Sequence, residues 1–280
     1  MKILISADME GATGVTWPAD VEPGTEQWQR CRRMFTSDVN AAVAGFYDGG
    51  ATVVLINEAH ATMRNLLLED LDKRAVMLIG RHKELSMVEG IQQGDVDGVA
   101  FVGYHAAAGA EGVLAHTYLP NSIIAVRVNG TRASEGLVNS FVAAEYGVPI
   151  VLVTGDDQTC ADAEGYAPGV PAVAVKDCVS RYAAVCRPPE VTAEAIRTAA
   201  SRGMKLAGRL DPARRHAREP FQVEVEVDAA QLAQSAAIVP TVRRTGERTV
   251  AYESSSAFDM IRCFKVVCTM ISSAVEERYG

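Results

Sequence analysis

Runs of hydrophobic residues recur along the first two thirds of the chain, and each is followed by small or polar residues. Three of these runs, at residues 3–5, 53–56 and 99–102, are hydrophobic at every position. A short continuous run bounded by polar residues is typical of a parallel strand that is buried on both faces. We predict further strands at residues 75–79, 123–128, 150–154 and 172–175.

Between the first two runs, hydrophobic residues recur every three to four positions. Trp28, Cys31 and Phe35 follow this spacing, which predicts an amphipathic helix over residues 25–48. Thr25 suits the amino-terminal cap of this helix, and the glycine pair after it suits its end. A second helix is expected at residues 134–146. Strands that alternate with helices predict an α/β fold, in which a mostly parallel sheet is flanked by helices.

The pattern changes after Pro188-Pro189, which we interpret as a domain boundary. Residues 221–227 alternate hydrophobic and polar positions, as a half-exposed antiparallel strand does. We therefore expect a catalytic α/β domain at residues 1–188 and a smaller α+β domain at residues 189–280. The other elements expected in the smaller domain are a helix at 191–210, a charged stretch at 214–219, a hairpin at 241–252 around Thr245-Gly246, and a last helix at 257–277.

Composition and charge narrow the classes of partner. The 280-residue chain is 48% hydrophobic and carries a formal net charge of −8 without a basic run. Nucleic acids and anionic membranes both need clustered lysine and arginine, so neither is expected as a partner. No hydrophobic stretch is long enough to span a bilayer, and the first strand begins too early to leave room for a signal peptide. We therefore expect a cytoplasmic protein, whose six cysteines are reduced, buried thiols.

Side chains that can bind metal follow three of the predicted strands. Asp8 and Glu10 follow the first hydrophobic run, His60 follows the second, and His105 follows the third. In an open parallel sheet, the carboxyl ends of the strands meet at one edge, where ligands bind. Histidine nitrogens and carboxylate oxygens are the ligands of hydrolytic zinc sites. The sequence therefore indicates a metal centre at this edge.

Each of these residues also has a simpler explanation. Asp8 and Glu10 are two positions apart at a strand end, so their side chains converge, and a shared cation would relieve their repulsion. Glu10 could instead cap the following helix or pair with an arginine. A single histidine at a strand end, such as His60 or His105, is more often a hydrogen-bonded residue than a ligand. The occurrence of two such histidines beside an acidic pair favours a metal site.

Other polar residues remain ambiguous on pattern alone. Glu135 lies in the first turn of a predicted helix, where an acidic residue normally complements the helix dipole. His116 follows a loop of small residues and could reach the metal centre or be an ordinary loop histidine. Asp156 and Asp157 follow a strand, and either could orient a ligating histidine or cap a helix. We assign no role to the two remaining histidines, His82 and His216.

The order of these motifs resembles that of the M55 metallopeptidases, the D-aminopeptidase family. The resemblance extends from residue 1 to about residue 180. The C-terminal third carries no sharp motif. The matching segments are Ser6-Ala7-Asp8-Met9-Glu10-Gly11, Asn57-Glu58-Ala59-His60, Ser86-Met87-Val88-Glu89-Gly90, Gly103-Tyr104-His105-Ala106, Gly112-Val113-Leu114-Ala115-His116, Asn129-Gly130 with Ser134-Glu135, and Gly155-Asp156-Asp157.

The resemblance implies two Zn²⁺ ions per subunit and specific roles for six residues. Asp8 would bridge the two ions, Glu10 and His105 would complete one site, and His60 and Glu135 the other. His116 would be the catalytic histidine. The family further implies a homo-oligomer, a decamer, that hydrolyses short peptides with an amino-terminal D-residue, such as D-Ala-D-Ala.

Two other classes of function fit the same residues. A dinuclear centre also serves hydrolases of other amide bonds or of phosphoesters. A metal-dependent protein that binds peptides without cleaving them is the non-enzymatic alternative. Turnover of any amide with added zinc separates the enzymes from the binding protein.

Overall fold

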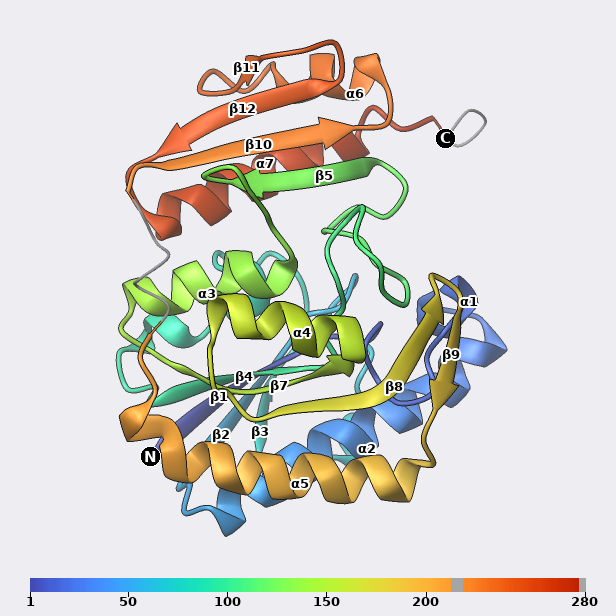
Figure 1. The fold of residues 1–280 in the computed structure, drawn as a ribbon, viewed down its shortest axis with the longest axis vertical. Helices are drawn as coiled ribbons and strands as arrows, with labels where there is room; N and C mark the ends of the chain where they lie inside the picture. Colours follow the sequence, from blue (N-terminus) through green and yellow to red (C-terminus); the bar gives the residue numbers. More distant parts are fainter. Residues whose placement is uncertain (213–218, 277–280) are drawn as a thin grey trace.

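The computed structural model describes residues 1–212 and 219–276, which form two sheets with helices between and below them (Figure 1). The larger sheet has seven strands, of which six are parallel and the last is antiparallel. This confirms the predicted mostly parallel sheet flanked by helices. In spatial order the strands are β3 (Val76–Leu78), β2 (Val53–Glu58), β1 (Lys2–Ala7), β4 (Gly98–Val102), β7 (Ile150–Asp156), β8 (Ala172–Ser180) and β9 (Ala183–Cys186).

The smaller sheet is antiparallel and lies above the larger one in Figure 1. The strand predicted at residues 123–128 is confirmed with the same bounds, and it belongs to the smaller sheet, where Val126 pairs with Val225. Ile124 and Arg127 in this strand are only partly buried, and a hydrophobic run does not itself specify its partner strand. In spatial order the strands are β11 (Arg243–Arg244), β12 (Thr249–Ser254), β10 (Phe221–Val227), β5 (Ile123–Val128) and β6 (Thr131–Arg132).

Helices cover both faces of the larger sheet. In Figure 1, α2 and α5 lie side by side below it, while α3 and α4 lie above it, and α7 lies between α3 and the smaller sheet. The α-helices are α1 (Pro18–Val21), α2 (Glu26–Asp48), α3 (Glu135–Glu145), α4 (Asp157–Tyr166), α5 (Pro189–Leu206), α6 (Ala230–Ala236) and α7 (Ala257–Ser272). Short 3₁₀ helices occur at Leu68–Asp70, Ser86–Val88, Ile91–Gln93 and Ala207–Arg209.

The local signals in the sequence explain where the helices begin and end. The Thr25 hydroxyl accepts a hydrogen bond from the backbone N–H of Trp28, and α2 ends at Asp48 with Gly49 as its carboxyl-terminal cap, as predicted. Ser134 caps α3 in the same way, through the N–H of Leu137. The last helix is shorter than expected, because α7 ends at Ser272. The end of the predicted range, residue 277, and most of the charged stretch, residues 214–218, lie outside the described residues.

The division of the chain at residue 188 stays a prediction. Helix α5 follows this point and packs against α2 on the larger sheet. Strands β5 and β6 precede it and belong to the smaller sheet. The chain therefore contributes segments from both sides of Pro188 to each layer of the structure.

The larger sheet separates two hydrophobic cores. Successive residues of β1 point to opposite faces, so Ile3 and Ile5 pack with α2 and α5 while Leu4 packs in the core that reaches the smaller sheet. All three side chains are fully buried. This explains why the parallel strands are hydrophobic at every position.

The six cysteines are free thiols. The expectation that they are buried holds for Cys31 and Cys268, but Cys186 is exposed at the edge of the sheet. Within residues 1–212 and 219–276, no helix combines the length and hydrophobicity needed to cross a membrane.

The contact between α2 and α5 yields a test of the packing. A Cβ atom at Gly45 would lie 2.2 Å from the carbonyl oxygen of Arg197 in α5. Gly45→Ala should therefore lower the free energy of unfolding by about 1–3 kcal/mol, as overpacking does. Gly165→Ala is the matched control, because its Cβ meets nothing within 4 Å and helix propensity favours alanine by ~0.5–1 kcal/mol. Urea unfolding measures both changes, and an unaltered Gly45→Ala protein would contradict the described packing.

Candidate metal centre

The carboxyl ends of three parallel strands bring the predicted metal-binding residues together. Asp8 directly follows β1, His60 lies just beyond β2, and His105 lies just beyond β4. Glu135 enters from the first turn of α3, and His116 enters from the loop between β4 and β5. All of these residues, and Glu10, are at most 8% exposed. The structure therefore gathers all six candidate residues in one buried cluster.

The Asp8 carboxylate lies between two histidines. Its Oδ1 atom is 3.6 Å from Nδ1 of His60, and its Oδ2 atom is 3.3 Å from Nε2 of His105. The two oxygens of this carboxylate therefore face two different imidazoles.

The other two carboxylates complete the cluster. Glu10 Oε2 is 2.9 Å from Nδ1 of His60, and Glu10 Oε1 is 3.7 Å from Nε2 of His116. Glu135 Oε1 is 3.5 Å from Nε2 of His105 and 4.0 Å from Nε2 of His116. The rings of His105 and His116 stack with their centroids 4.0 Å apart. His116 is thus part of the cluster and not a separate loop histidine.

Backbone carbonyls orient the three histidines. In each ring one nitrogen lies within hydrogen-bond distance of a backbone carbonyl, which directs the other nitrogen toward the carboxylates. This is the arrangement in which proteins fix the tautomer of a metal-binding histidine. The contacts are His60 Nε2 with Val21 O at 3.0 Å, His105 Nδ1 with Ala106 O at 3.0 Å, and His116 Nδ1 with Leu114 O at 2.8 Å.

The electrostatics of the cluster fit the binding of cations. Burial, reinforced by the charge of Glu10, raises the pKa of Asp8 to about 7. Burial alone would lower the pKa of His105, but the charge and hydrogen bonding of Glu135, together with the charges of Asp8 and Glu10, outweigh it and raise that pKa to about 10. Asp8 Oδ2 and His105 Nε2 are buried and make no hydrogen bond within the described part of the chain. Imidazole nitrogens and carboxylate oxygens with open positions match the ligand preference of zinc.

Asp156 supports the loop that carries His116. Its Oδ1 atom accepts a hydrogen bond from the N–H of Thr159 at 2.8 Å, which confirms the helix-cap role that the sequence left open. Its Oδ2 atom accepts a hydrogen bond from the N–H of Val113 at 2.7 Å. Asp157 instead accepts one from the N–H of Cys178 at 2.6 Å. Asp156 therefore joins α4 to the segment just before His116.

Sequence reasoning missed Lys176, which is fully buried in β8. Its Nζ atom donates to the carbonyl oxygens of Glu10 at 2.6 Å, Ala12 at 3.0 Å and Val15 at 2.6 Å. Burial lowers the pKa of Lys176 to about 8, although the charge of Asp156 opposes this shift. One feature of the sequence could have pointed to Lys176. It lies one residue beyond the predicted strand at 172–175, and therefore at the sheet edge that also carries Asp8.

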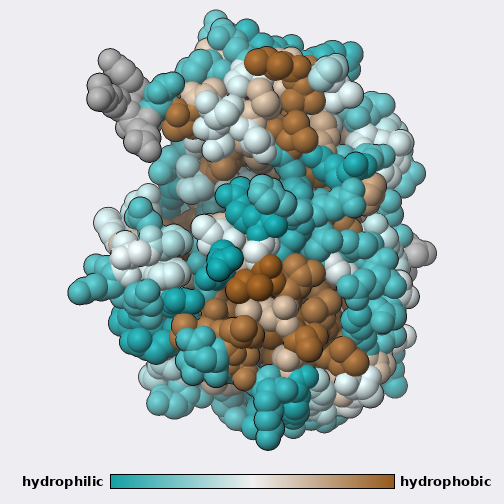
Figure 2. Space-filling view, turned by 180° about the vertical axis from the view of Figure 1, so that it is seen from behind, coloured by the Kyte–Doolittle hydropathy of each residue, from teal (hydrophilic) through white to brown (hydrophobic). Residues whose placement is uncertain are grey.

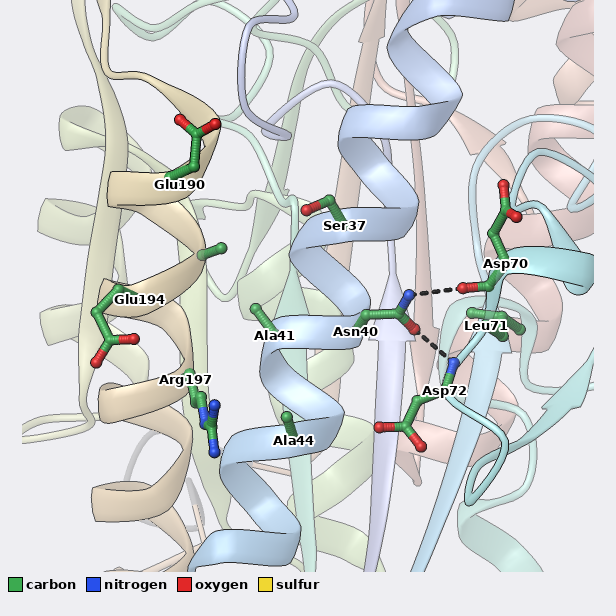
Figure 3. Close-up of a pocket in the computed structure, with 11 residues that line it drawn as sticks. Ser37, Asn40, Ala41, Ala44, Asp70, Leu71, Asp72, Glu190, Glu194 and Arg197 are labelled. Carbon is green, nitrogen blue, oxygen red and sulfur yellow. Dashed lines mark hydrogen bonds between the residues drawn. The ribbon is translucent and has the colours of Figure 1, made fainter.

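The remaining histidines and the surface groove lie apart from this chemistry. His82 is exposed, and His216 lies outside the described residues. A groove of about 460 Å³ lies between α2, α5 and the turn at residues 70–72 (Figure 3). There the Asn40 side chain donates to the carbonyl of Asp70 and accepts from the N–H of Asp72, both at 2.8 Å. These polar groups hold the turn against α2.

Comparison with known proteins identifies the family of the chain. The sequence matches the peptidase M55 family, described as D-aminopeptidase, over residues 1–266. The D-aminopeptidase of Bacillus subtilis (strain 168) is 31% identical over 285 residues, which cover the whole of both chains. The structure of DppA from Bacillus subtilis, a zinc-dependent D-aminopeptidase and self-compartmentalizing protease, superposes with a TM-score of 0.92 and 28% identity. That superposition covers 97% of this chain and 98% of DppA. The chain therefore belongs to the M55 family of D-aminopeptidases and is a metallopeptidase.

Proposed function

We propose that this metallopeptidase uses two zinc ions to remove the amino-terminal residue of short peptides that begin with a D-amino acid, such as D-Ala-D-Ala. The observation that carries the dinuclear site is the position of Asp8, whose two oxygens face His60 and His105 separately. The substrate class rests on the family and on the zinc-dependent D-aminopeptidase relative.

Asp8 would contact both ions in this proposal. Glu10 and His105 would complete one site, and the ligand atoms of these three residues lie within 4.8 Å of one another. The family resemblance assigns His60 and Glu135 to the other site, whereas in the structure the carboxylate nearest to His60 Nδ1 is that of Glu10, at 2.9 Å. His105, His116 and Glu135 form a second group of the same compactness, so the role of His116 needs a test that separates metal binding from turnover.

The chain's own residues provide the remaining chemistry. Bound zinc would polarise the scissile carbonyl and lower the pKa of an attacking water. Burial, together with the charge of His105, lowers the pKa of His116. A neutral imidazole can take a proton from the water and give it to the leaving amine.

We also propose that the chain assembles into a decamer. The related DppA is described as self-compartmentalizing, and a closed assembly would keep folded proteins away from the site. Figure 2 shows hydrophobic residues gathered on the lower half of the back face, which is the half that holds the larger sheet. The edge strand β3 exposes Val76, and the β8–β9 hairpin exposes Val179 and Val185. Exposed hydrophobic surface of this kind is typical of subunit contacts.

Metal content tests the bridging role of Asp8. Asp8→Ala should lose both zinc ions, because both would depend on its carboxylate. His60→Ala should weaken zinc binding mainly at one of the two proposed sites. His82→Ala is the control, because His82 is exposed and outside the cluster. Zinc is measured by elemental analysis after loading and desalting. Full zinc content in Asp8→Ala would contradict the proposed centre.

Loss of the His116 imidazole separates catalysis from metal binding. His116→Ala should retain both zinc ions and lose ~10²-fold or more in kcat, as expected for a group that transfers a proton or stabilises an oxyanion. Zinc analysis and steady-state kinetics on the same sample provide both readouts. Loss of one zinc would instead make His116 a ligand, and wild-type turnover would remove it from the mechanism.

Stereochemical preference tests the substrate class. Inversion at the α-carbon exchanges the side chain with hydrogen when the amine and carbonyl stay fixed, and displacement of the reacting carbonyl by ~1 Å can cost ~10²-fold in rate. We expect kcat/KM for D-Ala-D-Ala to exceed that for L-Ala-L-Ala by at least ~10²-fold. Kinetics on the matched dipeptides at equal zinc content measure this ratio. An L preference would refute the substrate assignment and leave the metallopeptidase intact.

The assembly state is open to direct measurement. Sedimentation velocity should give the mass of a decamer. The measurement is made at enzyme concentrations over which the specific activity does not change. A fully active monomer under the same conditions would refute the compartment while leaving the metal centre in place.

A further inference from the structure

Lys176 is a buried cation whose donors all go to one loop. The side chain is fully buried, and no carboxylate within residues 1–212 and 219–276 lies at ion-pair distance from its Nζ atom. The three N–H groups of the ammonium instead contact three carbonyl oxygens, those of Glu10, Ala12 and Val15. A buried charge without an ionic partner is costly unless every donor is satisfied. The geometry therefore links Lys176 to the backbone of residues 10–15.

The same loop is fixed at two further points. Gly11 donates to the carbonyl of Gly103 at 2.7 Å, and a Cβ atom at Gly11 would lie 1.8 Å from the carbonyl oxygen of Tyr104. The Asp38 carboxylate accepts hydrogen bonds from the backbone N–H of Thr13 at 2.8 Å and from its hydroxyl at 2.9 Å. Among the described residues, only Lys176 donates to the carbonyl of Glu10, whose side chain enters the metal cluster.

We propose that Lys176 is a positioning residue that sets the Glu10 carboxylate in the zinc centre by holding the carbonyls of Glu10, Ala12 and Val15. This inference rests on the proposed function for the identity of the metal. Lys176 acts through Glu10 and does not contact substrate or metal. Groups that orient a metal ligand from behind commonly contribute 10- to 100-fold to metal affinity.

The test is a double-mutant cycle on zinc affinity. Lys176→Met keeps the length of the side chain and removes its donors, and Glu10→Gln removes a ligand charge. Zinc dissociation constants are measured by chelator competition, which reports on metal binding and not on turnover. Lys176→Met should weaken zinc binding at one site by about 10- to 100-fold. The double variant should bind zinc no more weakly than Glu10→Gln alone, because both changes act on the same ligand.

Two controls separate positioning from general stability. Val225→Ala removes methyl groups from a fully buried position in β10 of the smaller sheet, so it should lower Tm while zinc affinity stays at the wild-type value. Lys176→Gln retains two N–H donors and should bind zinc with an affinity between those of the wild type and Lys176→Met. The cobalt(II) absorption spectrum of the Lys176 variants should change shape, whereas that of Val225→Ala should match the wild type.

The outcomes distinguish this inference from the proposed function. Wild-type zinc affinity and cobalt spectrum in Lys176→Met, or additive losses in the cycle, would overturn the positioning role even if Tm falls. If Lys176→Met does not fold, Lys176→Gln replaces it in the cycle with the same criteria. A wild-type protein that binds zinc but hydrolyses no peptide would refute the proposed function, and the affinity cycle would still decide the role of Lys176.

Discussion

Burial of three carboxylates at one edge of the sheet is the constraint on which the site depends. Asp8, Glu10 and Glu135 are each at most 5% exposed, and like charges in a buried site repel strongly. Positive charge must therefore be supplied, either by protonated imidazoles or by metal ions. Because each histidine ring is held through one nitrogen by a backbone carbonyl, the other nitrogen is directed to where a cation would sit.

The residues of the cluster come partly from the ends of sheet strands and partly from loops. Strands β1, β2 and β4 place Asp8, His60 and His105 at one edge of the sheet. The relative positions of these three residues are therefore fixed by the pairing of the parallel strands. Glu10 and His116 lie on loops, which need separate support. Lys176 holds the first loop and Asp156 the second, and both supports come from the neighbouring strands β7 and β8.

The sequence predicted the elements whose signals are local. The hydrophobic strands and the capped helix α2 follow from periodicity and cap residues, and the end of each strand locates Asp8, His60 and His105. The positions of Glu135 and His116 could not be derived in this way, because an acidic first-turn residue and a loop histidine are common and only tertiary packing brings them to the cluster. Only the position of Lys176 just beyond a predicted strand pointed to it, since its partners are backbone carbonyls, which leave no trace in the pattern of side chains. The pairing of β5 with β10 likewise depends on a distant strand.

In the proposed centre, the Asp8 carboxylate joins two zinc ions. A crystal structure of the zinc-loaded protein, with anomalous difference maps recorded at the zinc absorption edge, is the sharpest test of this arrangement. Two anomalous peaks per chain are expected, each about 2.0–2.2 Å from a different oxygen of Asp8. A single peak, or two peaks of which only one contacts Asp8, would contradict it.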